Sequence, residues 1–489
     1  MKLKASVCSF LTSTALIITV LPAISFADND KDVIRAALPN GAIEHILVID
    51  MENENYNSTF GATSPAVYLN TTLLSLGQLI PNYFGTSHVS AGNYISQVSG
   101  QGPTQALTND CLNLSSLSHP PVIGGFDDVL PGTDAPDQVA NPGQVIGDGC
   151  VMPAPSANGL GVITIGDQLD AIYSDDKDEK KAKHHRLNWR SYAEDMGNNI
   201  ARDYGNPDPL GGATCAHPPI GGVDYSNSAA ADDQYATRHN PFVYFHSVID
   251  DQARCDSHVV PLGGVTVGQN GEPDSFTGHL AQDLSRVETT PKFLFVSPNL
   301  CNDGHDATCA GPNVEGTKNA AGKNIGGLVS ADLWLKHWMP LIFNSTAYQS
   351  GKMLVVLTFD ESGLSDSRAC PFVDQSLCNA PSGPNVNYFG FSQVLGLFGV
   401  QNPKTPNLYP GGGQVGAVLF NKCYIKPGTV NNAGYYNHFS ALRSYEDLLG
   451  LHKGGDDGLG HLGYAAKADL VPFGSDVFNS KPNREKDQE

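Results

Sequence analysis

The chain has 489 residues, and 29 lysines and arginines stand against 50 aspartates and glutamates, so the formal net charge is −21. Charged residues make up 16% and hydrophobic residues 40% of the chain, a balance typical of a globular protein rather than a disordered one. The acidic excess argues against nucleic-acid binding, which needs a basic surface, and against polybasic docking on an anionic membrane.

The first 27 residues have the pattern of a secretory signal peptide. Lys2 and Lys4 precede a short apolar stretch, and Ser25 and Ala27 occupy the small-residue positions of a cleavage site. No later segment approaches the roughly 20 apolar residues that a membrane span needs. We therefore expect a secreted or periplasmic protein with no transmembrane segment; the sequence leaves its oligomeric state open.

Nine cysteines follow the signal peptide, and export permits disulfides. Near neighbours along the chain predict four pairs and one unpaired thiol. The four pairs are Cys301–Cys309, Cys370–Cys378, Cys111–Cys150 and Cys215–Cys255. A cysteine metal cluster is not expected, because the sequence has no Cys-x-x-Cys.

Apolar runs at 43–51, 292–296 and 352–359 predict buried strands, and amphipathic stretches at 331–343 and 438–451 predict helices. Apolar strands that alternate with helices favour an α/β fold, with a largely parallel central sheet flanked by helices.

The segment 101–160 is rich in Gly, Pro, Asn and Asp and predicts long loops stapled by disulfides rather than a separate domain. We expect a polar lead-in over 28–40, one catalytic domain over 41–478 and a polar tail over 479–489.

Acidic and amide side chains follow two of the predicted strands. Glu52 and Asn53 come directly after the first strand, and Asp360 and Glu361 directly after the third. Ligands of open α/β sheets collect at this edge, and carboxylates gathered there repel one another unless a cation lies between them. The four residues predict a divalent metal site, with Zn²⁺ favoured and Ca²⁺ or another divalent ion as alternatives. Ordinary solvated loop acids are the other interpretation.

Four histidines lie in loops rich in Asp, Asn and Gly, the kind of segment that carries function on a rigid scaffold; they are His88, His239, His305 and His438. Each by itself is more often a structural histidine. The chain has no Gly-x-Ser-x-Gly, no His-Glu-x-x-His and no Walker loop, which argues against lipases of the α/β-hydrolase type, zincins and P-loop enzymes.

Short motifs follow one another in a fixed order along residues 44–466: Glu52-Asn53, His88 to Tyr94, Asn188 to Tyr192, His239 to Phe242, Asn299 to Asp306, Asp332 to Leu335, Phe359 to Glu361, Tyr436 to Phe439 and His461 to Ala465. This series resembles the secreted phosphoesterase family that contains bacterial phospholipases C and acid phosphatases of the AcpA type, whose fold is similar to that of alkaline phosphatase. The chain departs from the family's His-Pro-Ser-x-Pro-Asn-Tyr segment at Val89 and Gly92, where both prolines are missing.

The resemblance implies a secreted, metal-dependent phosphoric ester hydrolase with Ser90 as its nucleophile. It implies that Glu52, Asn53, Asp360 and Glu361 hold the metal, that His88, His239, His305 and His438 are catalytic, and that Asn93, His239, His305 and Asp306 bind substrate. Direct metal ligation by His88 and His438 is an open alternative. Asp306 is expected to orient an imidazole.

Two substrates fit this resemblance. A phospholipase C that cleaves phosphatidylcholine-like lipids is favoured, because several tyrosines near the motifs could form an aromatic cage for choline; they are Tyr56, Tyr83, Tyr94, Tyr435 and Tyr436. An acid phosphatase acting on soluble phosphomonoesters is the alternative. A minor alternative is a non-catalytic binding protein on the same scaffold.

Overall fold

The computed structural model describes residues 38–104, 106–111, 125–131, 142–155, 161–174, 187–363 and 412–483. The predicted signal peptide, most of the lead-in, and the Cys370–Cys378 pair lie outside the described residues. The division into lead-in, catalytic domain and tail stays a prediction.

Strand β1, His45–Met51, is a mainly apolar run in which every side chain is buried, as suits the interior of a parallel sheet covered on both faces. It pairs in parallel with β12, Phe293–Ser297, on one side and with β13, Met353–Phe359, on the other. The three predicted strands are therefore confirmed, and they lie side by side.

The central sheet has eight strands in the order β15-β2-β14-β13-β1-β12-β6-β9. Only β14 runs antiparallel to its neighbours within this sheet, so the predicted largely parallel sheet is confirmed. The other five strands are β2 (Gln78–Ile80), β6 (Trp189–Ala193), β9 (Val259–Pro261), β14 (Ala417–Phe420) and β15 (Thr429–Val430).

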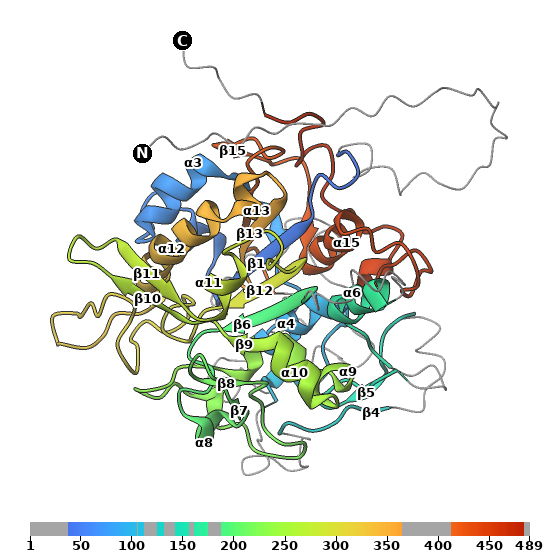
Figure 1. Ribbon diagram of the computed structural model, residues 1–489, viewed down its shortest axis with the longest axis horizontal. Coiled ribbons are helices and arrows are strands. Elements are labelled where there is room, and N and C mark those ends of the chain that lie inside the picture. The colour runs from blue at the N-terminus through green and yellow to red at the C-terminus, as the bar shows by residue number, and fades with distance from the viewer. Residues whose placement is uncertain are drawn as a thin grey trace, which may run out of the picture.

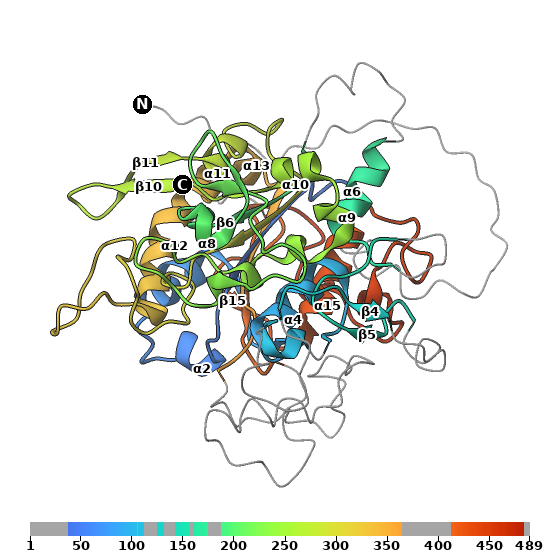
Figure 2. The same ribbon diagram turned by 90° about the horizontal axis from the view of Figure 1, so that it is seen from below.

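Helices cover both faces of this sheet (Figure 1). On one side lie α4 (Ser90–Ser99), α6 (Ile165–Ser174) and α15 (His438–Leu448), and on the other α12 (Gly327–Asn344) and α13 (Thr346–Gln349). The two predicted helices are confirmed as α12 and α15. Figure 2 shows α4 and α15 next to each other, and the two helices are in contact.

The remaining elements are short. The helices are α2 (Tyr56–Thr59), η1 (Leu69–Leu73), α3 (Leu74–Leu76), η2 (Leu107–Asn109), α8 (Ile200–Asp203), η3 (Tyr225–Asn227), η4 (Thr237–His239), η5 (Pro241–Tyr244), α9 (His246–Ile249), α10 (Gln252–His258), α11 (His279–Asp283) and η7 (Gly463–Ala466). The two-stranded pairs are β3 (Tyr83–Phe84) with β16 (Tyr436–Asn437), β4 (Leu130–Pro131) with β5 (Gly147–Asp148), β7 (Asn206–Pro207) with β8 (Ala213–Thr214), and β10 (Gly264–Val267) with β11 (Pro273–Thr277).

Three predicted disulfides are confirmed: Cys111–Cys150, Cys215–Cys255 and Cys301–Cys309. Cys423 is disulfide-bonded as well, so no cysteine in the described part of the chain matches the predicted unpaired thiol. No helix within these described ranges has the length and apolarity to cross a bilayer.

Candidate active site

Two acidic pairs from distant parts of the chain meet at the carboxyl edge of the sheet. Strands β1 and β13 end side by side. The Asn53 N–H donates to Asp360 Oδ1 at 3.1 Å, and the Asp360 N–H donates to the Met51 carbonyl at 2.9 Å. Residues 52–53 and 360–361 therefore converge, as their positions after the two strands predict.

Ser90 is the first residue of α4, beside these acids. Its hydroxyl donates to Glu52 Oε2 at 2.9 Å, and the residue is only 3% exposed. The N–H groups at the start of a helix carry partial positive charge and favour an anion there. Ser90 is thus placed where a nucleophile would meet a bound anion.

Asn93 holds the loop that carries His88. Its Oδ1 accepts from the N–H groups of Thr86 and Ser87, both at 2.8 Å, and its Nδ2 donates to the Ser87 carbonyl at 2.9 Å. A Cβ on Gly92 would lie 2.7 Å from Ser87 Oγ. Ser87 therefore leaves little room for a side chain at position 92, and the contacts of Asn93 make it a positioning residue.

Two of the four histidines are hydrogen-bonded to the second acidic pair, Asp360 and Glu361. His88 Nδ1 is hydrogen-bonded to Glu361 Oε2. His438 Nε2 donates to the Asp360 carbonyl at 2.6 Å, and its Nδ1 lies 3.1 Å from the Tyr83 hydroxyl. Burial lowers the pKa of His438 to about 4, so the ring is neutral. Both of its nitrogens are engaged, which leaves it to anchor the Asp360 peptide.

His239 lies against Glu52 from the other side. Its Nε2 is 3.0 Å from Glu52 Oε1, and its Nδ1 is 3.5 Å from Asp303 Oδ2. The ring stacks on Tyr94, with centroids 5.1 Å apart and an interplanar angle of 7°. Burial, together with the charges of Arg238 and His305, lowers the pKa of His239 well below its usual value. The imidazole is neutral at physiological pH.

His305 is the exposed cation of the site. Its Nδ1 lies 2.8 Å from Asp306 Oδ1, as expected of an orienting carboxylate, and this hydrogen bond is the largest cause that raises the pKa of His305 to about 9. Its side chain is 39% exposed. Nearby, burial raises the pKa of Glu54 to about 7, although the charge of His305 lowers it. An imidazolium here is a candidate proton donor.

The carboxylates of the site are buried close together. Burial is the first cause that raises the pKa of Glu52 well above its usual value, and Asp360 and Asp303 add to it. Burial and the nearby Glu361 raise the pKa of Asp360 well above its usual value. Burial and the nearby Asp110 raise the pKa of Glu361 in the same way. Such a group of acids is held ionised only by a cation.

Several buried atoms of the site make no hydrogen bond, although His239 Nε2 and Glu52 Oε1 lie 3.0 Å apart: they are Glu52 Oε1, Asn53 Oδ1, Asp360 Oδ2, Asp303 Oδ2 and His239 Nε2. Oxygen and imidazole nitrogen donors are the ligands that divalent cations take in proteins. Within the described ranges, however, no three His, Cys, Asp or Glu side chains form a group that could hold a metal ion. The donor chemistry fits a divalent ion, and the ligand set is a proposal.

Three site residues were missed in the sequence. Asp303 follows β12, and its carbonyl accepts from the Glu52 N–H at 2.9 Å. Arg238 precedes His239 in η4 and is 8% exposed. Asp110 Oδ1 accepts from the Ala91 N–H at 2.9 Å. Asp303 and Arg238 stand inside or beside a motif and could have been found there, whereas no local pattern marks Asp110.

The predicted choline cage is not open. Tyr83 contacts His438, Tyr94 stacks on His239, and the Tyr436 hydroxyl donates to Asp476 Oδ2 at 2.6 Å. All three side chains are at most 2% exposed. Since three of the five tyrosines are packed inside the protein, the sequence argument for a choline lipid loses its support.

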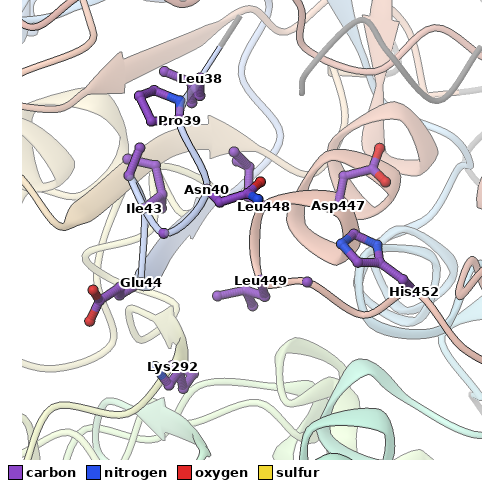
Figure 3. Close-up of a pocket in the computed structure, with 13 residues that line it drawn as sticks. Leu38, Pro39, Asn40, Ile43, Glu44, Lys292, Asp447, Leu448, Leu449 and His452 are labelled. Atoms are coloured by element: carbon purple, nitrogen blue, oxygen red, sulfur yellow. The ribbon is translucent and has the colours of Figure 1, made fainter. Parts of the chain in front are cut away.

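A cavity of about 450 Å³ lies away from this site (Figure 3). Among its lining residues, Glu44 and Lys292 directly precede β1 and β12, and Leu448 is the last residue of α15. It therefore lies at the amino edge of the sheet, opposite the acidic pairs, and contributes nothing to their chemistry.

Comparison with known proteins gives phosphatase relatives. No model of a known protein family matches the chain. The chain is 28% identical over 148 residues to an acid phosphatase of Aspergillus fumigatus, and 29% identical over 142 residues to a probable acid phosphatase of Kluyveromyces lactis. These segments are 30% and 29% of this chain and 25% of each relative. The match thus spans about a quarter of the length of these curated relatives.

The solved structures to which the chain is similar include a protein of the alkaline phosphatase superfamily from Vibrio parahaemolyticus, with a TM-score of 0.36, 9% identity, and coverage of 85% of this chain and 68% of that one. Another is an inactive form of murine ectonucleotide pyrophosphatase / phosphodiesterase 5, with a TM-score of 0.33, 10% identity, and coverage of 88% and 100%. The resemblance to bacterial phospholipases C stays a prediction.

Proposed function

We propose that this protein is a metal-dependent phosphoric ester hydrolase that uses Ser90 as its nucleophile. The observation that carries the proposal is the Ser90 hydroxyl at the start of α4, 2.9 Å from a buried Glu52 carboxylate. Glu52, Asn53 and Asp360 would hold the divalent ion, which when bound supplies positive charge beside the serine oxygen. Glu361, the fourth ligand expected from the sequence, is paired with His88.

The chain's own groups account for the proton transfers. Ser90 Oγ attacks phosphorus as its proton passes to Glu52 Oε2, the acceptor 2.9 Å away. The bond from phosphorus to the leaving alcohol oxygen breaks, and that oxygen takes a proton from the His305 imidazolium. Water then attacks the phosphoseryl ester: its proton goes to the neutral His305, the bond from phosphorus to Ser90 Oγ breaks to release phosphate, and Glu52 returns its proton to Ser90. His88 and His438 position the acids, and Asp306 orients His305.

We favour phosphomonoesters as substrates over phosphatidylcholine-like lipids. Three of the five tyrosines of the predicted cage are packed inside the protein, and the curated relatives are acid phosphatases. The disulfides fit an exported protein, and secretion or a periplasmic location is part of the proposal.

A two-substrate assay tests the proposed function. Purified protein is offered p-nitrophenyl phosphate and p-nitrophenyl phosphorylcholine, with and without a chelator. We expect chelator-sensitive hydrolysis of the first. Hydrolysis of the second alone would indicate a phospholipase C, and hydrolysis of neither would leave only the non-catalytic binding role.

A further inference from the structure

The N–H that follows the nucleophile is already occupied by a carboxylate. Asp110 Oδ1 accepts from the Ala91 N–H at 2.9 Å. The first turn of α4 has no acidic residue of its own, so this anion comes from a loop that the Cys111–Cys150 disulfide fixes next to the helix. Asp110 therefore lies at the positive end of α4, directly beside Ser90.

The same carboxylate also faces a buried cation. Arg238 Nε lies 3.6 Å from Asp110 Oδ2, and the two side chains are 9% and 16% exposed. Arg238 Nη1 donates to the Asn227 carbonyl at 3.3 Å, which anchors the guanidinium. A buried guanidinium without an anion is costly, and guanidinium groups bind phosphate as readily as carboxylate.

We propose that the Ala91 N–H and Arg238 form the cradle for the non-bridging oxygens of the substrate, and that Asp110 is a resident carboxylate which the phosphoryl group displaces. The inference rests on the proposed function and deepens it. A phosphoryl group in contact with Ser90 Oγ would bring its other oxygens toward the N–H of the next residue, Ala91, where donors stabilise the developing charge.

This exchange selects a class of substrate. A phosphomonoester dianion brings two charges to Arg238 in place of the single charge of Asp110, whereas a diester brings only one. The dianion therefore gains more from the exchange than the diester does. The cradle would make this site selective for monoesters, and inorganic phosphate, the product, would compete for it.

Phosphate binding, measured by calorimetry on the full mature chain, tests this without turnover. In Asp110→Asn, which keeps an acceptor for the Ala91 N–H but removes the charge, we expect the Kd of inorganic phosphate to fall on the order of tenfold, because a like charge is gone. Asp110→Glu keeps the negative charge, so its Kd for phosphate should not fall. Arg238→Gln should raise the Kd at least about tenfold.

The matched control is Asp283→Asn. Asp283 pairs with Arg190 at 2.8 Å, and both side chains are 10% exposed, so the variant breaks a comparable buried pair outside the site. It should leave phosphate binding unchanged. Unchanged or weaker phosphate binding in a folded Asp110→Asn variant would overturn the proposal, because Asp110 would then not compete with phosphate.

The two proposals fail separately. If the protein is an active hydrolase and neither Asp110→Asn nor Arg238→Gln changes its Kd for phosphate, the cradle is refuted and the proposed function stands. A protein without hydrolase activity that still shows the expected changes in phosphate binding would refute the proposed function and keep the cradle. For an active enzyme, Arg238→Gln should also lower kcat/KM more for p-nitrophenyl phosphate than for bis(p-nitrophenyl) phosphate.

Discussion

Replacing Asn93 with alanine should separate positioning of the catalytic loop from contact with substrate. The change removes the acceptor of the Thr86 and Ser87 N–H groups and the donor to the Ser87 carbonyl. Each buried group left without a partner costs about 1–3 kcal/mol. Three groups lose their partner, and the loop can shift so that water reaches them. We therefore expect about 1 kcal/mol for each group, a loss of roughly 3 kcal/mol in the free energy of unfolding.

The same shift should reduce turnover. His88 lies in this loop and Ser90 begins α4 directly after it; a displacement of about 1 Å at a reacting group costs on the order of 100-fold in rate. We therefore expect kcat on p-nitrophenyl phosphate to fall by that order in Asn93→Ala. Asn93→Asp keeps both backbone N–H groups satisfied and should recover most of the stability. Urea unfolding and steady-state kinetics measure the two effects.

Asn421 provides a matched control far from the acidic pairs. Its Oδ1 accepts from the N–H groups of Cys423 and Tyr424, and its Nδ2 donates to the carbonyls of Gly351 and Met353. Asn421→Ala should lose similar stability and keep its kcat. If Asn93→Ala lost stability but kept wild-type kcat, the loop's position would not matter and the reasoning would be refuted.

Three further predictions concern the chemistry itself. Ser90→Ala should abolish nearly all turnover with a native circular dichroism spectrum; near-normal activity would remove Ser90 as the nucleophile. Chelation should inactivate the protein and Zn²⁺ or Ca²⁺ should restore it, while an active, chelator-resistant protein without metal by elemental analysis would remove the cofactor. His305 should set an alkaline limit, because its pKa is raised from 6.5 to about 9. Its contribution to stability is full below about pH 6.5 and is lost as pH rises through about 9. kcat should fall as pH rises through about 9, and His305→Gln should flatten that limb of the pH profile; an unchanged limb would exclude His305 as the acid.

The pattern of apolar and acidic residues along the chain was enough to predict the strands that carry the site and the edge of the sheet where the site lies. Apolar runs in the sequence predict buried strands, and the carboxyl ends of parallel strands lie at the same edge of a sheet. For this reason Glu52 and Asp360 could be placed together, although 308 positions separate them. The three confirmed disulfides could also be predicted from the sequence, because each joins two cysteines that follow one another along the chain.

The roles of the individual side chains were decided by tertiary contacts alone. A histidine's charge depends on its burial and its partners: His438 is neutral between Tyr83 and the Asp360 carbonyl, while His305 is charged beside Asp306. The same holds for Asp110, whose loop shows no helical or strand period and is brought to α4 by packing and a disulfide. Periodicity records which face of an element is buried, but it carries no information on which distant group will face a given side chain.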